Sequence, residues 1–279
     1  MAPLGLGTGF YGLGPTMNSD SAAAVVIPKG TAVKTNDGNV QGLYFEASVL
    51  QSTFRASFTM AIWAKLVDGQ PSSAQVLIGN LGDGNNHCIL QINTDGTVTF
   101  DFQGDGDSHQ NKTDDVIFTN GANAYKHIAV TMTIVGGGNS TSIIYVDGAA
   151  VATTIVGGAE ISEAKHAAWA HGSDNFGIGA MGTRTSLSNI TSSGLAADLA
   201  EFAIWNIALD AAAIAKVEDL GVPTDSNFPN LLVDAADYDV SSRLVTYHKL
   251  NDYSGGFATE QIVGFDDYTG VLVGDSKFV

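Results

Sequence analysis

The sequence predicts an all-β protein built as a sandwich or a barrel, and three observations lead to this prediction. Several stretches alternate apolar and polar side chains with the period of two that a half-buried strand requires. Glycine, asparagine and aspartate separate these stretches at short intervals. Helical patterns are confined to short pieces of the chain. Many short strands at close spacing favour two packed antiparallel sheets or a closed barrel.

The clearest strand patterns lie at residues 58–66 and 126–135. In FTMAIWAKL every even-numbered position is apolar, and in KHIAVTMTIV the even-numbered positions from Ile128 onward are apolar. Each stretch therefore presents one face to a core and the other to a different environment. Further short strands are expected at 75–79, 87–92, 97–102, 115–118, 142–146, 149–156, 175–180 and 198–205.

Two hairpins are predicted from their turns. NTDG, from Asn93 to Gly96, joins the strands on either side of it, and Asp147-Gly148 does the same. Asp-Gly supplies the positive φ angles that a type I′ turn requires.

One helix is predicted with clear boundaries, over residues 211–220. Asp210 stands at the N-cap position, and Leu209 and Ile214 occupy the two positions of a hydrophobic staple. Gly221 follows the last helical residue, which is typical of a helix end.

Length and charge restrict the function classes. The chain has 279 residues, which fits one large β domain with short appendages. It carries 12 Lys and Arg against 29 Asp and Glu, for a net charge of -17. Phosphate binding needs a basic footprint, so neither a nucleic acid nor an anionic membrane is an expected partner.

Cysteine content and the N-terminal sequence bear on the compartment. Cys88 is the single cysteine, so we expect no intrachain disulfide and no cysteine-based zinc site. The first residues lack the basic start and apolar stretch of a signal peptide, and no run reaches the ~18 apolar residues that span a bilayer. Classical secretion is therefore not expected.

Residues 1–24 differ in composition from the rest and are predicted to form a glycine-rich docking arm. Glycine at this density costs backbone entropy, which contacts with another surface can offset. A frayed terminus is the alternative. The apolar side chains expected to dock are Leu4, Leu6, Phe10, Tyr11 and Leu13.

Five motifs follow one another between residues 43 and 220. They are the aromatic-centred strand around Trp63, YKHIAVT from Tyr125, YVDG from Tyr145, GIG from Gly177, and AEFAIW from Ala200, which leads into the helix. This order resembles that of the laminin-G-like, concanavalin A-like jelly-roll domain. The resemblance implies an all-β jelly-roll β-sandwich with one short helix on the C-terminal side. Ala213 departs from the pattern, because the family has an acid there.

The domain organisation follows from this resemblance. Residues 1–24 form the arm, 25–222 the laminin-G-like sandwich, and 223–279 a closing segment packed on the sandwich. LVTYHKLNDYSGG within that last segment is similar to a stretch that often accompanies such domains.

The same jelly roll also carries laminarinase-type glycoside hydrolases, whose E-x-D-x-x-E strand places two carboxylates on one face. The nearest match here has Ala196 at the nucleophile position, followed by Asp198 and Glu201. We therefore expect no catalysis. Trp63 and Trp205 are expected to serve packing rather than to act as sugar platforms.

Calcium is the ion expected if a metal is bound, because hard oxygen ligands cluster in two loops. Neither loop fits an EF-hand, and ordinary solvated turns are the alternative. The candidate ligands are Asp83, Asn85, Asp105 and Asp107.

Residues 158–171 form an insertion without a counterpart in the family pattern, with a weak helical turn. His166, Trp169 and His171 within it are candidates for an exposed contact surface, for instance for a glycan. The alternative is a helical turn that covers a sheet edge.

A glycine-rich arm before a laminin-G-like domain resembles virion structural proteins of tailed bacteriophages. The resemblance implies a non-catalytic capsid decoration protein on the virion surface. It would bind neighbouring subunits such as the major capsid protein, and a homo-oligomer, for example a trimer, is plausible. The alternative is a lectin-like, carbohydrate-binding adhesion module on a fibre or tail appendage, which binds a cell-surface glycan.

Overall fold

The computed structural model describes most of the sandwich. The described residues are 33–34, 42–46, 50–66, 69–80, 85–121, 124–158, 161–170, 175–179, 195, 197–221, 231–235, 238–248, 253–254, 257–259, 269–273 and 277–278. The predicted arm, with Leu4, Leu6, Phe10, Tyr11 and Leu13, lies outside them. So do Asp83 and His171. The predictions for these residues stay predictions.

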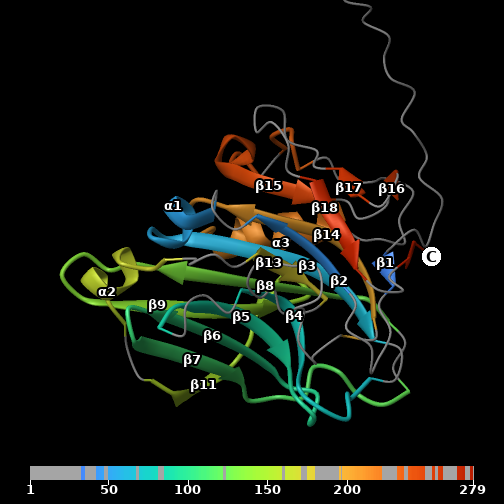
Figure 1. Cartoon of the computed structure of the whole chain (residues 1–279), viewed down its shortest axis with the longest axis horizontal. Helices are drawn as coiled ribbons and strands as arrows, with labels where there is room; N and C mark the ends of the chain where they lie inside the picture. The colour runs from blue at the N-terminus through green and yellow to red at the C-terminus, as the bar shows by residue number, and fades with distance from the viewer. Residues whose placement is uncertain are drawn as a thin grey trace, which may run out of the picture.

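Two antiparallel sheets pack face to face (Figure 1), so the predicted all-β sandwich is confirmed. In the described part of the chain, sheet A has nine strands in the order β10-β9-β8-β3-β14-β1-β19, with β12 beside β9 and β15 beside β14. Its strands are β10 (Ala149–Ala150), β9 (Asn139–Val146), β8 (Lys126–Thr133), β3 (Phe58–Leu66), β14 (Ala197–Trp205), β1 (Val33–Lys34), β19 (Lys277–Phe278), β12 (Ile161–Ser162) and β15 (Leu244–His248).

Over the same described residues, sheet B has ten strands in the order β11-β7-β6-β5-β4-β13-β2-β18-β17-β16. Its strands are β11 (Thr153–Gly157), β7 (Asp107–Thr113), β6 (Val98–Gly104), β5 (His87–Ile92), β4 (Gln75–Asn80), β13 (Asn175–Ile178), β2 (Gly42–Glu46), β18 (Thr269–Val273), β17 (Phe257–Thr259) and β16 (Tyr253–Ser254). The segment predicted as closing structure therefore contributes strands to both sheets.

The space between the sheets is filled by one apolar core. Strand alternation points Ile62 of β3 and Leu90 of β5 into it, and both are fully buried. Cys88 is also fully buried, as a small apolar side chain. Aromatic rings dominate one end of the core, where Phe54 of α1 (Gln51–Phe54) contacts Phe58 with ring centroids 4.6 Å apart.

The outer face of sheet A is covered by a second apolar layer. Helix α3 (Ala211–Gly221) lies there, and Ile214 packs with Trp205 of β14 and Tyr238. The helix begins as predicted, because Asp210 Oδ1 accepts a hydrogen bond from Ala213 N at 2.8 Å, and Leu209 is buried beside Ile214. Sheet A is therefore buried on both faces over this layer.

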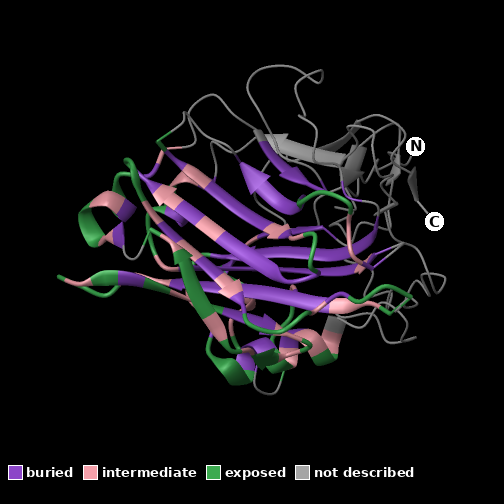
Figure 2. Ribbon diagram, turned by 90° about the horizontal axis from the view of Figure 1, so that it is seen from below, coloured by how far each residue is buried: buried purple, intermediate pink, exposed green. Residues whose placement is uncertain are grey.

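The outer face of sheet B carries no such layer among the described residues. Buried and intermediate residues alternate along β7, whereas β3 and β14 in the middle of sheet A are almost wholly buried; striped and uniformly buried strands are both seen in Figure 2. Strand β5 has the pattern of a half-buried strand, with intermediate exposure at His87 and Gln91. Polar side chains of intermediate exposure are therefore gathered on the outer face of sheet B.

One predicted strand is wrong, and several strands were not predicted, β7 and β15 among them. No strand forms at 115–118; β7 lies just before it. Strand β7 has polar residues at its inward positions, His109, Asn111 and Thr113, and all three are buried. Asn111 Nδ2 donates to Ser142 O of β9 at 3.3 Å. Because hydrogen bonds replace apolar contacts along β7, its sequence shows no apolar alternation.

The turns differ from their prediction in one case. Asp147 and Gly148 have φ angles of 48° and 77°, which confirms the positive φ angles of a type I′ turn. In NTDG only Gly96 has a positive φ angle, 76°, so this loop is not type I′. A further hairpin, between β6 and β7, turns at Asp105 and Gly106, whose φ angles are 45° and 89°.

The insertion at 158–171 closes one end of the sandwich. It contains β12 and helix α2 (Glu163–Ala167), and it carries Trp169 into the core, where the side chain is 0% exposed. Trp169 Nε1 donates to His87 O at 3.3 Å, and Arg55 Nε donates to Trp169 O at 2.6 Å. His166 is also 0% exposed. The predicted exposed surface at Trp169 and His166 is therefore wrong, because apolar burial at the open end of the sandwich outweighs exposure of these rings.

We expect Trp169→Ala to lower the free energy of unfolding by about 3–5 kcal/mol, because it leaves a cavity in the aromatic core. Urea denaturation measures this change. Val233→Ala is the control: Val233 is 57% exposed, and its truncation should change the free energy by no more than about 0.5 kcal/mol. Equal effects of the two substitutions would contradict the placement of Trp169.

Candidate functional site

The outward side chains of β5, β6 and β7 form a polar face on sheet B. Strand register sets them in three rows: His87 lies opposite Gln103, which lies opposite Ser108; Ile89, Asp101 and Gln110 form the second row; and Gln91, Thr99 and Lys112 form the third. We call this set the polar face. Its polar members are His87, Gln91, Thr99, Asp101, Gln103, Ser108, Gln110 and Lys112.

Asp101 holds the centre of the polar face. His87 Nε2 lies 2.9 Å from Asp101 Oδ1, and Gln110 Nε2 donates to Asp101 Oδ2 at 3.0 Å. Gly157 of β11 allows Gln110 to lie this way, because a Cβ at Gly157 would come within 2.7 Å of Gln110 Oε1. The carboxylate therefore holds Gln110 by a hydrogen bond and has the His87 ring beside it.

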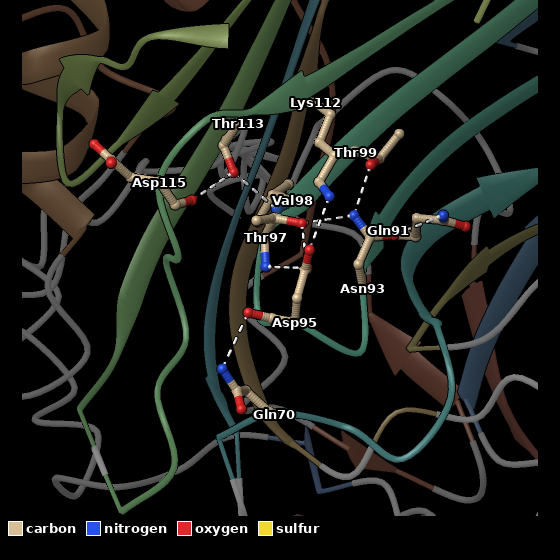
Figure 3. A network of polar contacts seen from close by, with 10 residues as sticks. All are labelled: Gln70, Gln91, Asn93, Asp95, Thr97, Val98, Thr99, Lys112, Thr113 and Asp115. Atoms are coloured by element: carbon tan, nitrogen blue, oxygen red, sulfur yellow. Dashed lines mark hydrogen bonds and ion pairs between the residues drawn. The ribbon is translucent and has the colours of Figure 1, made fainter. Parts of the chain in front are cut away.

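A second network fixes the end of the polar face at the NTDG turn (Figure 3). Asn93 Nδ2 donates to Thr97 Oγ1 at 2.9 Å and to Thr99 Oγ1 at 2.7 Å. Lys112 Nζ lies 2.8 Å from Asp95 Oδ2. The hydrogen bond from Lys112, followed by those from Thr97, lowers the pKa of Asp95 to about 2. The hydrogen bonds from Lys112 and Thr97 therefore favour the ionised form of Asp95.

The polar face offers hydrogen bonds rather than stacking surfaces. Seven of its polar side chains are half-buried and Thr99 is buried. Neighbouring strands lie about 4.8 Å apart. Amide, hydroxyl and carboxylate groups at this spacing suit a flat ligand rich in hydroxyl groups. Trp63, Trp169 and Trp205 are all buried elsewhere, as expected for Trp63 and Trp205.

The two acids of the hydrolase motif lie on the opposite side of the molecule. Asp198 lies on the outer face of sheet A with its Oδ2 2.7 Å from Lys65 Nζ. A bulge between Ala200 and Ala203 gives Glu201 a φ of 52°, and Tyr247 donates its hydroxyl hydrogen to Glu201 Oε2. Both carboxylates are buried. Each has a partner, Asp198 in Lys65 and Glu201 in Tyr247 of the second apolar layer.

His127 lies on this same outer face and is 1% exposed. Its ring contacts the Trp63 ring at 5.2 Å, and neither ring nitrogen has a hydrogen-bond partner in the described part of the chain. The backbone N of His127 donates a hydrogen bond to Asp147 Oδ1. Burial, opposed by Asp147, lowers the pKa of His127 to about 4.

Lys165 forms an ion pair with the loop at which calcium binding was predicted. Lys165 Nζ lies 2.6 Å from Asp105 Oδ2 and donates to Asp105 O at 3.0 Å. Asn85 supplies a backbone oxygen to Gly106 N, and Asp107 begins β7. No group of three His, Cys, Asp or Glu side chains suited to a metal occurs among the described residues. Since Asp83 lies outside them, calcium at this loop stays a prediction.

Residues 37–215 match the family model described as the concanavalin A-like lectin/glucanases superfamily. The chain belongs to this superfamily. The resemblance inferred from the motif order is thereby confirmed, and the two sheets are those of its jelly-roll fold. No curated protein sequence matches the chain. No described helix is long and apolar enough to cross a membrane.

Solved structures of this superfamily's fold are similar to the chain at low sequence identity. A proposed carbohydrate-binding protein of Bacteroides ovatus shares 16% identity with a TM-score of 0.53; the match covers 90% of this chain and 60% of that protein, so the chain spans less than two thirds of it. The CBM40 domain of a Ruminococcus gnavus sialidase, bound to α2,3-sialyllactose, has 16% identity, coverages of 66% and 96%, and a TM-score of 0.45. A heptameric pentraxin of Limulus polyphemus has 13% identity, coverages of 70% and 78%, and a TM-score of 0.40.

We expect the protein to lose stability as the pH falls from about 6.5 towards about 4. Burial lowers the pKa values of His127, His166 and His248 to about 4, while unfolded histidine titrates near 6.5. Between these values the unfolded state binds more protons, so acid favours unfolding. Each pKa unit corresponds to about 1.4 kcal/mol per group. Urea midpoints measured from pH 7.5 to 4 test this loss.

His127→Gln separates this effect from the titration of carboxylates. The variant removes one of the three histidines, so its stability should change less between pH 6.5 and 4.5 than that of the wild type. A pH profile parallel to that of the wild type would show that His127 does not contribute.

Proposed function

We propose that the chain is a non-catalytic carbohydrate-binding module whose ligand lies along the polar face of sheet B. The observation that carries the proposal is the Asp101 network, which holds His87 and Gln110 in place on a half-exposed sheet face. Membership of a superfamily of lectins and glucanases supports it, as does the similarity to the carbohydrate-binding protein of Bacteroides ovatus. Carbohydrate binding is the alternative hypothesis that the sequence suggested.

The polar face favours a neutral glycan. A carboxylate stands at its centre, and the chain carries a net charge of -17, so an anionic sugar would meet unfavourable charge. Amide groups of Gln91, Gln103 and Gln110 can donate to and accept from sugar hydroxyls. Three rows of such side chains suit an extended chain of several sugar units.

We propose no catalysis because both candidate acids, Asp198 and Glu201, are buried and bound to other side chains. Glycoside hydrolysis uses two carboxylates that both reach the scissile bond. Asp198 is paired with Lys65, and Glu201 accepts a hydrogen bond from Tyr247 of the second apolar layer. Neither side chain shares a surface with the polar face.

A screen of the full chain against neutral and acidic polysaccharides tests the function, with and without a chelator. We expect Gln110→Ala and Asp101→Asn to weaken binding about tenfold, since each loses hydrogen bonds worth about 1 kcal/mol or more. Asn206→Ala is the matched control, because Asn206 is an exposed amide beyond the end of β14. Its affinity should equal that of the wild type.

The screen has two outcomes that contradict the proposal. One is the absence of binding to every glycan, and the other is binding that Gln110→Ala and Asp101→Asn leave unchanged. A loss of binding in the chelator arm would instead favour the calcium prediction at the loop of Asp105 and Asp107.

The phage virion role stays a prediction from the sequence. It depends on the arm at residues 1–24, which lies outside the described residues, and on an expected location at the virion surface. The copy number of the chain in purified particles, measured by quantitative mass spectrometry, tests it. A number comparable to that of the major shell protein would support a decoration protein, and absence from every particle would exclude one.

A further inference from the structure

A cavity of about 430 Å³ lies where the chain passes from β14 into α3. Two segments of the chain line it: residues 207–210 with Ala212 and Ala213, and Asp239 with Val240. We call it the α3 cavity. Its volume is in the range of sites that hold small molecules. None of its lining residues belongs to the polar face, so it is a separate candidate site.

Hydrogen bonds hold the first of these segments in place. Thr59 Oγ1 of β3 donates to Ile207 O and accepts from Leu209 N, both at 2.8 Å, and Thr59 is fully buried. Asp210 Oδ1 accepts from Ala213 N at 2.8 Å, which fixes this carboxylate at the first turn of α3. This part of the lining is therefore in place before a ligand arrives.

The second segment is held by the residue that precedes it. Tyr238 is fully buried; its hydroxyl donates to Leu231 O at 2.7 Å and accepts from Trp205 Nε1 at 3.2 Å. Its backbone also exchanges two hydrogen bonds with that of Ala235. Asp239 therefore follows an anchored residue. A cavity whose lining is fixed in this way costs a ligand little reorganisation.

The lining combines apolar side chains with two carboxylates. Ile207, Leu209 and Val240 belong to the second apolar layer or pack against it, so they suit a hydrocarbon body. Asp210 and Asp239 are both exposed. In the described part of the chain, neither of them forms an ion pair with a lysine or an arginine. The two negative charges of the cavity are therefore not neutralised by these residues.

These charges decide between ligand classes. An anion would meet two carboxylates on a chain with a net charge of -17, and an uncharged apolar ligand would gain nothing from them. The positive end of the α3 dipole offsets part of the charge of Asp210, whereas Asp239 lies outside the helix. An ammonium group donates strong hydrogen bonds to carboxylates. The lining therefore favours a cation.

We propose that the α3 cavity binds an organic cation, an ammonium group carried on a compact hydrocarbon body. The ammonium group donates to the carboxylates of Asp239 and Asp210, and the hydrocarbon body covers Ile207 and Val240. Because the cavity shares no residue with the polar face, this proposal does not depend on the proposed glycan.

Titration of the full chain with cyclohexylammonium chloride, followed by protein NMR, tests the proposal. We expect saturating shifts of the backbone amide signals of Ala212 and Ala213, with a dissociation constant of about 1 mM or lower. Cyclohexanol has nearly the same shape but no charge. It should bind at least about tenfold more weakly, because a hydrogen bond to a charged group is stronger than one between neutral groups.

Variants of the two carboxylates test which residues hold the cation. Asp239→Asn should weaken cyclohexylammonium binding about tenfold. Asp210→Asn keeps a residue that caps a helix as well as aspartate does, and it should weaken binding about threefold, because the helix dipole offsets part of this charge. Asp115→Asn is the matched control: it removes the same charge from an exposed aspartate outside the cavity, so the dissociation constant should not change.

The absence of saturation by about 10 mM cyclohexylammonium would overturn the proposal. Equal binding of cyclohexanol would overturn it as well, and so would equal losses in Asp239→Asn and Asp115→Asn, because they would reflect net charge alone. Circular dichroism of each variant checks that it is folded. If Asp239→Asn does not fold, Ala212→Leu provides a second test, because it fills the cavity from an exposed position and keeps both carboxylates.

Discussion

The fold depends on the burial of two sheet faces against each other. Neither sheet is stable alone, because each presents a row of apolar side chains that only the other can cover. Phe58 of sheet A meets Phe102 of sheet B with ring centroids 5.7 Å apart, and Trp169 stacks on Phe102 at 6.2 Å. The insertion that carries Trp169 is therefore part of the core, although it joins the chain as a loop.

The outer faces of the two sheets differ in what covers them. Part of the outer face of sheet A is covered by α3 and the second apolar layer, and His127, Asp198 and Glu201 on this face are buried. The outer face of sheet B is half-exposed and polar. The half-exposed side chains of β5, β6 and β7 are therefore the surface that we propose for a glycan.

The sequence predicted those parts of the fold whose burial pattern is apolar. Strand β3 was predicted with its observed bounds, because its inward positions are apolar and strict alternation results. Strand β7 was missed because its inward positions, His109, Asn111 and Thr113, are satisfied by hydrogen bonds. The turn before β7, which contains Asp105, was predicted as a candidate calcium site. Polar burial depends on partners from distant segments, and a local pattern does not reveal them.

The candidate site could not be predicted from local sequence patterns, for a related reason. Gln91, Thr99 and Lys112 are ordinary residues in three separate strands, and only the register sets them side by side. Conversely, Trp169 and His166 looked like contact residues because they stand close together in a polar insertion. Their burial follows from the open end of the sandwich that they close. Lys165 also escaped notice, although it brings a positive charge to Asp105 from a distant segment.

The burial of all three tryptophans has a practical consequence for spectroscopy. Trp63, Trp169 and Trp205 are at most 4% exposed, and none belongs to the polar face. Intrinsic tryptophan emission from this protein therefore reports the integrity of the two apolar layers. A sugar on sheet B would leave that emission unchanged, so titrations of ligands need calorimetry or a label placed on the polar face.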